Sequence, residues 1–185
     1  REEIIFTSGT TASINLVAFS FGEAFVNEGS EIIVSEAEHH SNIVPWQMLC
    51  QRKGAILRVI PVDDDGYLKL DELAAMLNDR TSIVCVTHIS NVLGIINPVR
   101  EIVKICHSKG VPVLIDGAQG AVHCCVDVRD IDCDFYAFSG HKLYGPTGIG
   151  VLYGKSELLE AMSPWLGGGK MVHEVSFDGF TTQSA

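Results

Sequence analysis

The sequence predicts an α/β protein: a three-layer α/β/α fold around a mixed, mostly parallel β-sheet. Two observations predict this fold class. Short apolar segments alternate with segments of helical composition along the whole chain. The apolar segments are continuously apolar, as strands covered on both faces are, whereas strands with one solvated face alternate apolar and polar residues. The length of 185 residues suits one domain of this kind.

The first half of the chain alternates strands with helices. A turn of three aspartates and a glycine over residues 63–66 separates the third strand from the third helix. Lys69 and Asp71 stand near the start of that helix as its caps. In chain order we expect strand 3–7, helix 12–27, strand 31–34, helix 42–53, strand 55–61 and helix 70–77.

The second half continues the alternation and then adds strands. Asn97-Pro98 is a helix start signal, because proline suits the first helical turn. In chain order we expect strand 82–87, helix 99–109, strands 111–115, 134–138 and 149–153, and helix 156–162.

The charge balance and hydropathy exclude two classes of partner. Lys and Arg number 13, Asp and Glu number 23, and the net charge is −10. That charge opposes binding to the phosphate backbone of nucleic acids. No apolar run reaches about 18 residues, the length of a membrane-spanning helix. We therefore expect neither a nucleic acid nor a membrane as a partner.

The cysteines and histidines predict neither a disulfide framework nor a metal site. The six cysteines are not spaced like those of a secreted disulfide-bonded protein. We therefore expect a reducing compartment, which is the cytoplasm or, in a eukaryote, an organelle. The neighbouring His39 and His40 are expected to point in different directions, which would make them a poor pair of metal ligands.

The two ends of the sequence predict that it is a piece of a longer protein. The chain opens at Arg1 without an initiator Met and goes straight into an apolar strand. It closes at Ala185 after a glycine-rich, turn-rich stretch. We expect residues 1–185 to form one domain that is truncated at both ends.

Ligands of parallel sheets bind at the carboxyl ends of the strands, so the residues after each strand are the candidates for a site. Gly9, Thr10 and Thr11 follow the first strand and could form a phosphate cradle at a helix start. The alternative is an ordinary helix cap. His39 follows the second strand and could stack on a flat ring or move protons. The alternative there is a turn capped by neighbouring polar residues.

Two more strands deliver polar residues to the same edge. Asn91 follows strand 82–87 and could bind a ligand substituent, or it could simply satisfy the backbone of its loop. Asp116 follows the continuously apolar strand 111–115, so its carboxylate would be buried and would need a cation or hydrogen bonds. Its alternative role is that of a helix cap.

Lys142 follows strand 134–138 among glycines and aromatic residues. A buried lysine amine is a nucleophile toward carbonyl groups, whereas the alternative is a surface lysine. Taken together, a phosphate cradle, a buried carboxylate and an amine at one sheet edge are what pyridoxal 5′-phosphate (PLP) needs.

The same residues carry a family resemblance that covers nearly the whole chain. The sequence resembles the large domain of the class V, fold type I PLP-dependent enzymes, and within them cysteine desulfurases of the SufS type. The SufS type is favoured by Pro45-Trp46-Gln47 and Tyr144-Gly145-Pro146. The strings that carry the resemblance are Gly9-Thr10-Thr11, Glu38-His39-His40-Ser41-Asn42, His88-Ile89-Ser90-Asn91, Asp116-Gly117-Ala118-Gln119 and Ser139-Gly140-His141-Lys142.

The resemblance implies a role for each of nine residues. Lys142 would form the Schiff base with PLP, and Asp116 would hold the pyridine nitrogen of the cofactor. His39 would stack on the ring and help to move protons. The others would contact the phenolic oxygen (Gln119 and Asn91) or the phosphate (Thr10, Thr11, Ser139 and His141).

The resemblance also implies an activity and partners. A cysteine desulfurase converts L-cysteine to L-alanine and passes the sulfur, as an enzyme-bound persulfide, to an acceptor protein for iron–sulfur cluster assembly. The family is homodimeric. Its persulfide cysteine, its substrate-binding arginine and its small domain would lie beyond residue 185, so we expect the chain alone to be inactive.

Other functions share this predicted cofactor site. A selenocysteine lyase acting on selenocysteine, a cysteine sulfinate desulfinase and another class V aminotransferase remain alternatives within the enzymes. A PLP-fold module that no longer catalyses and serves only as a binding partner is the alternative outside them.

Overall fold

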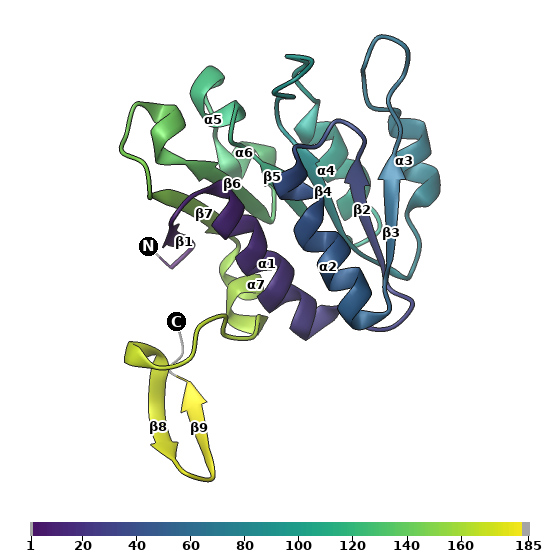
Figure 1. Cartoon of the computed structure of the whole chain (residues 1–185). Coiled ribbons are helices and arrows are strands. Elements are labelled where there is room, and N and C mark those ends of the chain that lie inside the picture. The colour runs from purple at the N-terminus through teal and green to yellow at the C-terminus, as the bar shows by residue number, and fades with distance from the viewer. Residues whose placement is uncertain (1, 183–185) are drawn as a thin grey trace.

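The computed structural model describes residues 2–182, and within that range its main sheet has seven strands in the order β1-β7-β6-β5-β4-β2-β3 (Figure 1). Arg1 and residues 183–185, which include the two ends discussed above, lie outside the described residues. The strands are β1 (Ile4–Thr7), β2 (Glu31–Ser35), β3 (Ile56–Ile60), β4 (Thr81–Thr87), β5 (Val113–Asp116), β6 (Phe135–Ser139) and β7 (Gly150–Gly154).

The main sheet is mixed and mostly parallel, as predicted. β7 pairs antiparallel with both of its neighbours, β1 and β6. The pairs from β6 across to β3 are all parallel. Every strand of this sheet except β7 therefore runs the same way, and their carboxyl ends meet at one edge.

Helices cover both faces of the sheet, which confirms the three-layer fold (Figure 1). On one face lie α1 (Thr10–Phe25), α2 (Val44–Lys53) and α7 (Ser156–Ala161), and on the other lie α3 (Leu70–Met76), α4 (Val99–His107) and α6 (Val128–Ile131).

The alternation of side chains along each central strand produces two cores. In β4, Ile83 and Cys85 pack with the α1 and α2 side, while Val84 and Val86 pack with the α3 and α4 side. All four are fully buried. The centre of a strand that buries both of its faces therefore takes apolar residues at successive positions, which is why the sequence shows a continuous apolar run there.

Three predicted boundaries differ from the structure for identifiable reasons. α1 begins at Thr10 rather than at 12, because Gly9 serves as its N-cap. The predicted helix 42–53 is a 3-10 turn, η1 (His40–Asn42), followed by α2 with Pro45 in its first turn. β5 begins at Val113 rather than at 111, since Pro112 has no N–H to donate to a neighbouring strand. The other ends shift by one or two residues.

The carboxyl-terminal stretch contains structure that the sequence did not predict. After η3 (Gly169–Met171), strands β8 (Val172–Ser176) and β9 (Gly179–Thr182) form an antiparallel hairpin that projects from the body (Figure 1). The one-turn helices α5 (Gly120–His123) and α6 were also not predicted.

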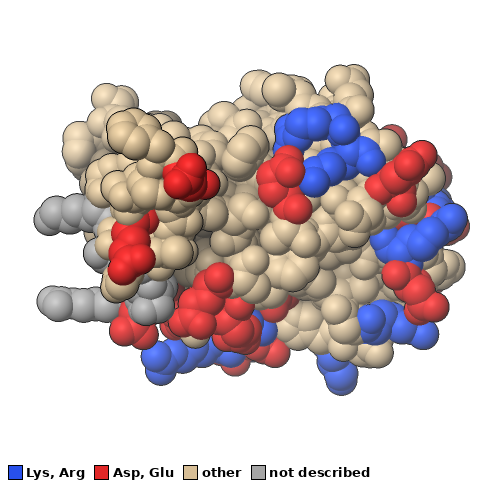
Figure 2. Space-filling model, turned by 90° about the horizontal axis from the view of Figure 1, so that it is seen from below, with Lys and Arg blue, Asp and Glu red and all other residues tan. Residues whose placement is uncertain are grey.

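The surface carries both signs of charge. Seen from below, on the face that Figure 2 shows, acidic and basic side chains lie next to one another rather than in separate fields. None of the helices within residues 2–182 has the length and apolar character needed to cross a membrane.

Candidate active site

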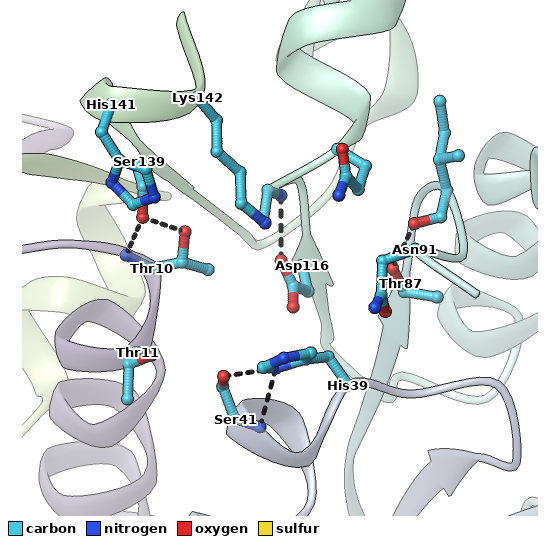
Figure 3. A pocket seen from close by; sticks show the side chains of 13 residues that line it. Thr10, Thr11, His39, Ser41, Thr87, Asn91, Asp116, Ser139, His141 and Lys142 are labelled. Carbon is cyan, nitrogen blue, oxygen red and sulfur yellow. Dashed lines mark hydrogen bonds between the residues drawn. The ribbon is translucent and has the colours of Figure 1, made fainter. Parts of the chain in front are cut away.

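A cavity of about 240 Å³ lies at the edge where the parallel strands end (Figure 3). All nine residues singled out from the sequence line it. Four further residues complete the lining: Ser41, Thr87, Ile89 and Ala118. Positions more than 100 residues apart in the chain thus converge, because parallel strands bring their following loops to one edge.

The start of α1 forms one end of the cavity. The backbone N–H of Thr10 donates to Ser139 Oγ at 2.7 Å, and the Thr10 and Ser139 hydroxyls are also 2.7 Å apart. Gly9 allows this approach because its φ of 154° is costly for other residues. The loop after β1 is therefore fixed to the end of β6.

The same helix end can receive an anion. Within the described residues, no acceptor pairs with the backbone N–H groups of Thr11 and Ala12, and the first turn of α1 carries no acidic side chain. Free N–H groups and the positive end of a 16-residue helix favour a negative charge. The exposed side chains of Thr11 and His141 line the cavity here.

Asp116 is the buried carboxylate of the site. It ends β5, only 3% of its surface is exposed, and its Oδ1 accepts the Ala118 N–H at 2.9 Å. Burial raises the pKa of Asp116, and the Ala118 hydrogen bond, Lys142 and His39 act in the opposite direction. A further cation or hydrogen-bond donor near the carboxyl group would therefore stabilise its charged form.

Lys142 reaches into the cavity toward Asp116 from a short 3-10 helix, η2 (Gly140–Leu143) (Figure 3). Its side chain is half-buried and does not lie free on the surface. The turn that presents it is closed by Gly140, whose N–H donates to Ile149 O at 2.9 Å and whose carbonyl accepts from Gly145 at 2.9 Å. A Cβ on Gly140 would stand 2.7 Å from the Ile149 side chain, so this turn requires glycine.

His39 lines the opposite wall and caps η1. Its Nδ1 accepts the backbone N–H of Ser41 at 3.2 Å and lies 2.6 Å from Ser41 Oγ. A backbone N–H can only donate, so the neutral imidazole carries its proton on Nε2. Burial lowers the pKa of His39, and His40 and Lys142 lower it further while Asp116 raises it.

The expectation that His39 and His40 point in different directions is wrong. Their rings stack, with centroids 3.9 Å apart and planes inclined by 34°. His39 has the extended backbone of an N-cap residue and His40 begins the 3-10 turn, so the chain changes direction between the two rings.

Asn91 and Gln119 line the wall beyond β4 and β5, where Asn91 is exposed and Gln119 is half-buried. Of the lining residues that the sequence analysis does not single out, Thr87 is the last residue of β4, where the strand-end rule would have found it. Ser41 lies in the turn that His39 caps.

The cysteines lie away from the cavity. All six are within the described residues, and none lines the cavity. Burial raises the pKa of the four buried thiols, Cys50, Cys85, Cys106 and Cys133, which keeps them protonated and unreactive.

Known proteins resemble the chain in both sequence and structure. The chain is 59% identical over 181 residues to a cysteine desulfurase of Dickeya dadantii, with 98% of this chain and 44% of that protein covered. It is 56% identical over 184 residues to a cysteine desulfurase of Cronobacter sakazakii, with 100% and 45% covered. The chain thus spans less than half the length of these relatives.

Solved structures agree. The cysteine desulfurase CsdA (S-sulfonic acid) of Escherichia coli superposes with a TM-score of 0.95 at 56% identity, over 100% of this chain and 46% of that one. The apo cysteine desulfurase of Thermococcus onnurineus NA1 superposes with a TM-score of 0.92 at 41% identity, over 99% and 46%. The SufS type stays a prediction, because the Escherichia coli structure carries the name CsdA.

The model of one family, aminotransferase class-V, matches residues 1–185, the full length of the chain. That match agrees with the class V resemblance read from the strings around the strand ends, and with the relatives and superposed structures above. The chain belongs to the aminotransferase class-V family.

Proposed function

We propose that this chain is the cofactor-binding part of a PLP-dependent cysteine desulfurase, which converts L-cysteine to L-alanine and retains the sulfur as a persulfide. The observation that carries the proposal is the convergence of Lys142, Asp116, His39 and the start of α1 on one cavity. The naming of relatives at 56–59% identity as cysteine desulfurases supports the choice of reaction.

The chemistry of the donor set fits PLP at three points. An anionic phosphate suits the free N–H groups of α1 and the hydroxyls of Thr10 and Ser139. A protonated pyridine nitrogen suits the buried Asp116, because a hydrogen-bond donor would stabilise the charged form of its carboxyl group. The aldehyde suits the Lys142 amine. Ala118 lines the cavity with only a methyl group, which leaves room for a flat ring.

Each residue then has a task that follows from its surroundings. When bound, PLP supplies an electron sink for the charge left at the α-carbon of an amino acid. Lys142 Nζ would hold the cofactor, and Asp116 would hold a proton at the pyridine nitrogen. His39, which carries its own proton on Nε2, would cover the ring and exclude water from that side.

The sulfur step requires a thiolate, and none of the six cysteines, all of which lie in the described range, lines the cavity. We therefore expect the chain alone to bind PLP but not to turn over L-cysteine. A persulfide cysteine in the rest of the protein, a homodimer, a cytoplasmic sulfur-acceptor protein and a link to iron–sulfur cluster assembly belong to the same proposal.

The test of the cofactor site is spectroscopic. Mixing the chain with PLP should give the visible absorption band of an imine, and borohydride should fix the cofactor onto Lys142, as located by peptide mass mapping. The Lys142→Ala protein should lack the band, while the Lys109→Ala protein, changed at an exposed lysine, should keep it. A Lys142→Ala protein with the full band would refute the assignment.

A second experiment separates the reactions that share this cofactor. The complete protein is offered L-cysteine, L-selenocysteine and L-cysteine sulfinate, and L-alanine formation is compared. A desulfurase should form alanine from L-cysteine with persulfide on the enzyme. Alanine from selenocysteine or sulfinate alone would point to the corresponding lyase or desulfinase. No alanine from any of the three would favour another class V aminotransferase or a non-catalytic module.

A further inference from the structure

We propose that Glu38 is a positioning residue of this site: its carboxyl group ties the loop that carries His39 to the carboxyl ends of β2 and β4. This inference deepens the proposed function, because His39 is the residue proposed to cover the cofactor ring. Glu38 itself does not line the cavity.

The contacts of Glu38 join three segments. Its Oε1 accepts the backbone N–H of Thr87, the last residue of β4, at 2.7 Å, and it also accepts the hydroxyl of Ser35, the last residue of β2. Its Oε2 accepts the side-chain amide of Asn42, in η1, at 2.7 Å. One carboxyl group thus holds two strand ends and the turn that His39 caps.

The ladder between β2 and β4 explains why a carboxyl group is needed here. Their pairing runs from Glu31 to Val34 on β2, and β2 ends one residue later, at Ser35. Beyond that point the Thr87 N–H has no β2 carbonyl to bind. Glu38 supplies the acceptor instead, because a buried N–H without a partner would destabilise the fold.

Both oxygens of Glu38 meet obligate donors. The Thr87 N–H can only donate, and the orientation of the Asn42 amide is fixed, because its Oδ1 accepts the indole N–H of Trp46 at 3.0 Å. Asn42 and Trp46 are both fully buried. A glutamine at position 38 must therefore turn its NH₂ group toward another donor in either orientation, so the position is specific for a carboxyl group.

The surroundings of Glu38 also set its charge. Burial raises the pKa of Glu38 to about 8, against the hydrogen bonds from Ser35, Asn42 and Thr87, and the charge of Asp116 raises it further. Burial and the neighbouring Asp116 therefore favour the neutral form of Glu38, whereas its three hydrogen-bond donors favour the charged form.

The decisive readout is the titration of His39 in the cofactor-free chain, followed by NMR of its imidazole proton. The charged and titratable groups that act on His39 are His40, Asp116 and Lys142. In the wild-type chain its pKa should lie below 6.5. In Glu38→Gln the loop loses its anchor and His39 gains water, so its pKa should rise toward about 6.5.

The matched control is Glu36→Gln, which makes the same substitution on the same loop at an exposed position. It should leave the His39 titration unchanged. PLP binding provides a second readout: we expect Glu38→Gln to weaken it by about tenfold, the size expected when one buried hydrogen bond is lost, and Glu36→Gln to leave it unchanged.

A double variant protects the test if Glu38→Gln does not fold. In Glu38→Gln with Asn42→Asp, the glutamine NH₂ donates to the new carboxylate, which still accepts from Trp46, so each donor again meets an acceptor. The double variant should restore the low pKa of His39. An unchanged His39 pKa in Glu38→Gln, or failure of the double variant to restore it, would overturn the proposal. Because this titration needs no cofactor, its outcome is independent of whether the wild-type chain binds PLP.

Discussion

At the scale of a single residue, the buried carboxyl group of Asp116 suits a ligand but lowers the stability of the cofactor-free fold. The fold buries its carboxyl group and raises its pKa above the ordinary value of 3.8. Between that value and the raised one, the folded chain holds a proton that the unfolded chain has released. Stability therefore falls as pH rises through this window, and above it the folded chain carries a buried charge without a full set of partners.

Asp116→Asn should accordingly stabilise the cofactor-free chain at neutral pH by about 1 kcal/mol, because the amide mimics the neutral carboxyl group and can still accept from Ala118. At pH 3, where the wild-type group is protonated in both states, the gain should disappear. Urea unfolding at the two pH values measures it, and PLP binding should weaken in the same variant.

The exposed Asp64 provides the control for that prediction. Asp64→Asn changes the same charge outside the site and should alter the unfolding free energy by less than about 0.5 kcal/mol. If Asp116→Asn destabilised the chain at neutral pH, groups of the protein itself would already stabilise the buried charge of Asp116. The argument that Asp116 needs a pyridine nitrogen as its partner would then fail.

At the scale of elements, the site depends on how closely β7 approaches the loop between β1 and α1. Gly150 pairs with Thr7 on one side and Ser139 on the other. A Cβ at Gly150 would stand 2.4 Å from Gly9 Cα, which is backbone and cannot swing aside. Gly150→Ala should therefore displace the start of α1.

We expect Gly150→Ala to lower the unfolding free energy by about 1–3 kcal/mol, the usual cost of overpacking, and to weaken PLP binding as the Thr10–Ser139 contact opens. Denaturant unfolding and a PLP titration measure the two effects. Gly167→Ala is the matched control, because nothing lies within 4 Å of the added Cβ. Equal losses in both variants would show that the close approach at Gly150 is unimportant.

The site's residues could be predicted from the sequence because they follow strands. A continuous apolar run marks a buried strand, and parallel strands bring their ends to one edge, so Asp116 and Lys142 could be placed together without coordinates. Their roles toward a cofactor stay predictions. The support of His39 could not be found this way, because Glu38 depends on which strands are neighbours, β2 beside β4, and this order is not written in any local pattern.

Other elements escaped the sequence for physical reasons. The predicted helix 42–53 is interrupted because Pro45 has no N–H to donate and is tolerated only in the first turn, so α2 begins at Val44 and a separate 3-10 turn precedes it. The β8–β9 hairpin has short strands with exposed side chains, so it lacks the apolar run that marks the strands of the main sheet. Local patterns predict the elements that the core requires and miss those that it does not.

Over the whole molecule, buried carboxyl groups at opposite edges of the sheet respond to pH in opposite ways. At the carboxyl edge, Asp116 and Glu38 have raised pKa values, which favours folding at lower pH. At the amino end of β2, burial would raise the pKa of Glu31, but the Asn78 hydrogen bond, Arg80 and Arg58 outweigh it and the pKa is lowered. Stability should therefore decline toward both acid and alkali, for reasons located at opposite edges.

Glu31→Gln tests the acid side of this profile. The Glu31 side chain is 1% exposed, and its oxygens accept from Arg58 at 3.0 Å, Arg80 at 2.5 Å and Asn78 at 3.0 Å. Because the lowered pKa stabilises the fold above the ordinary value of 4.5 and this gain is lost as pH falls through the folded-state pKa, the variant should lose stability at pH 7 and differ little from wild type in acid.

Since both arginines are partly exposed, solvent screens the pairs, and we expect a loss of about 1–2 kcal/mol at pH 7. Urea unfolding from pH 7 to pH 3 measures it, with Glu28→Gln as the exposed control. The two curves of wild type and Glu31→Gln should converge as the wild-type carboxylate takes up its proton. A difference in unfolding free energy between wild type and Glu31→Gln that stayed constant down to pH 3 would mean that Glu31 stabilises the fold through its packing rather than its charge. The loss of stability in acid would then arise from other groups.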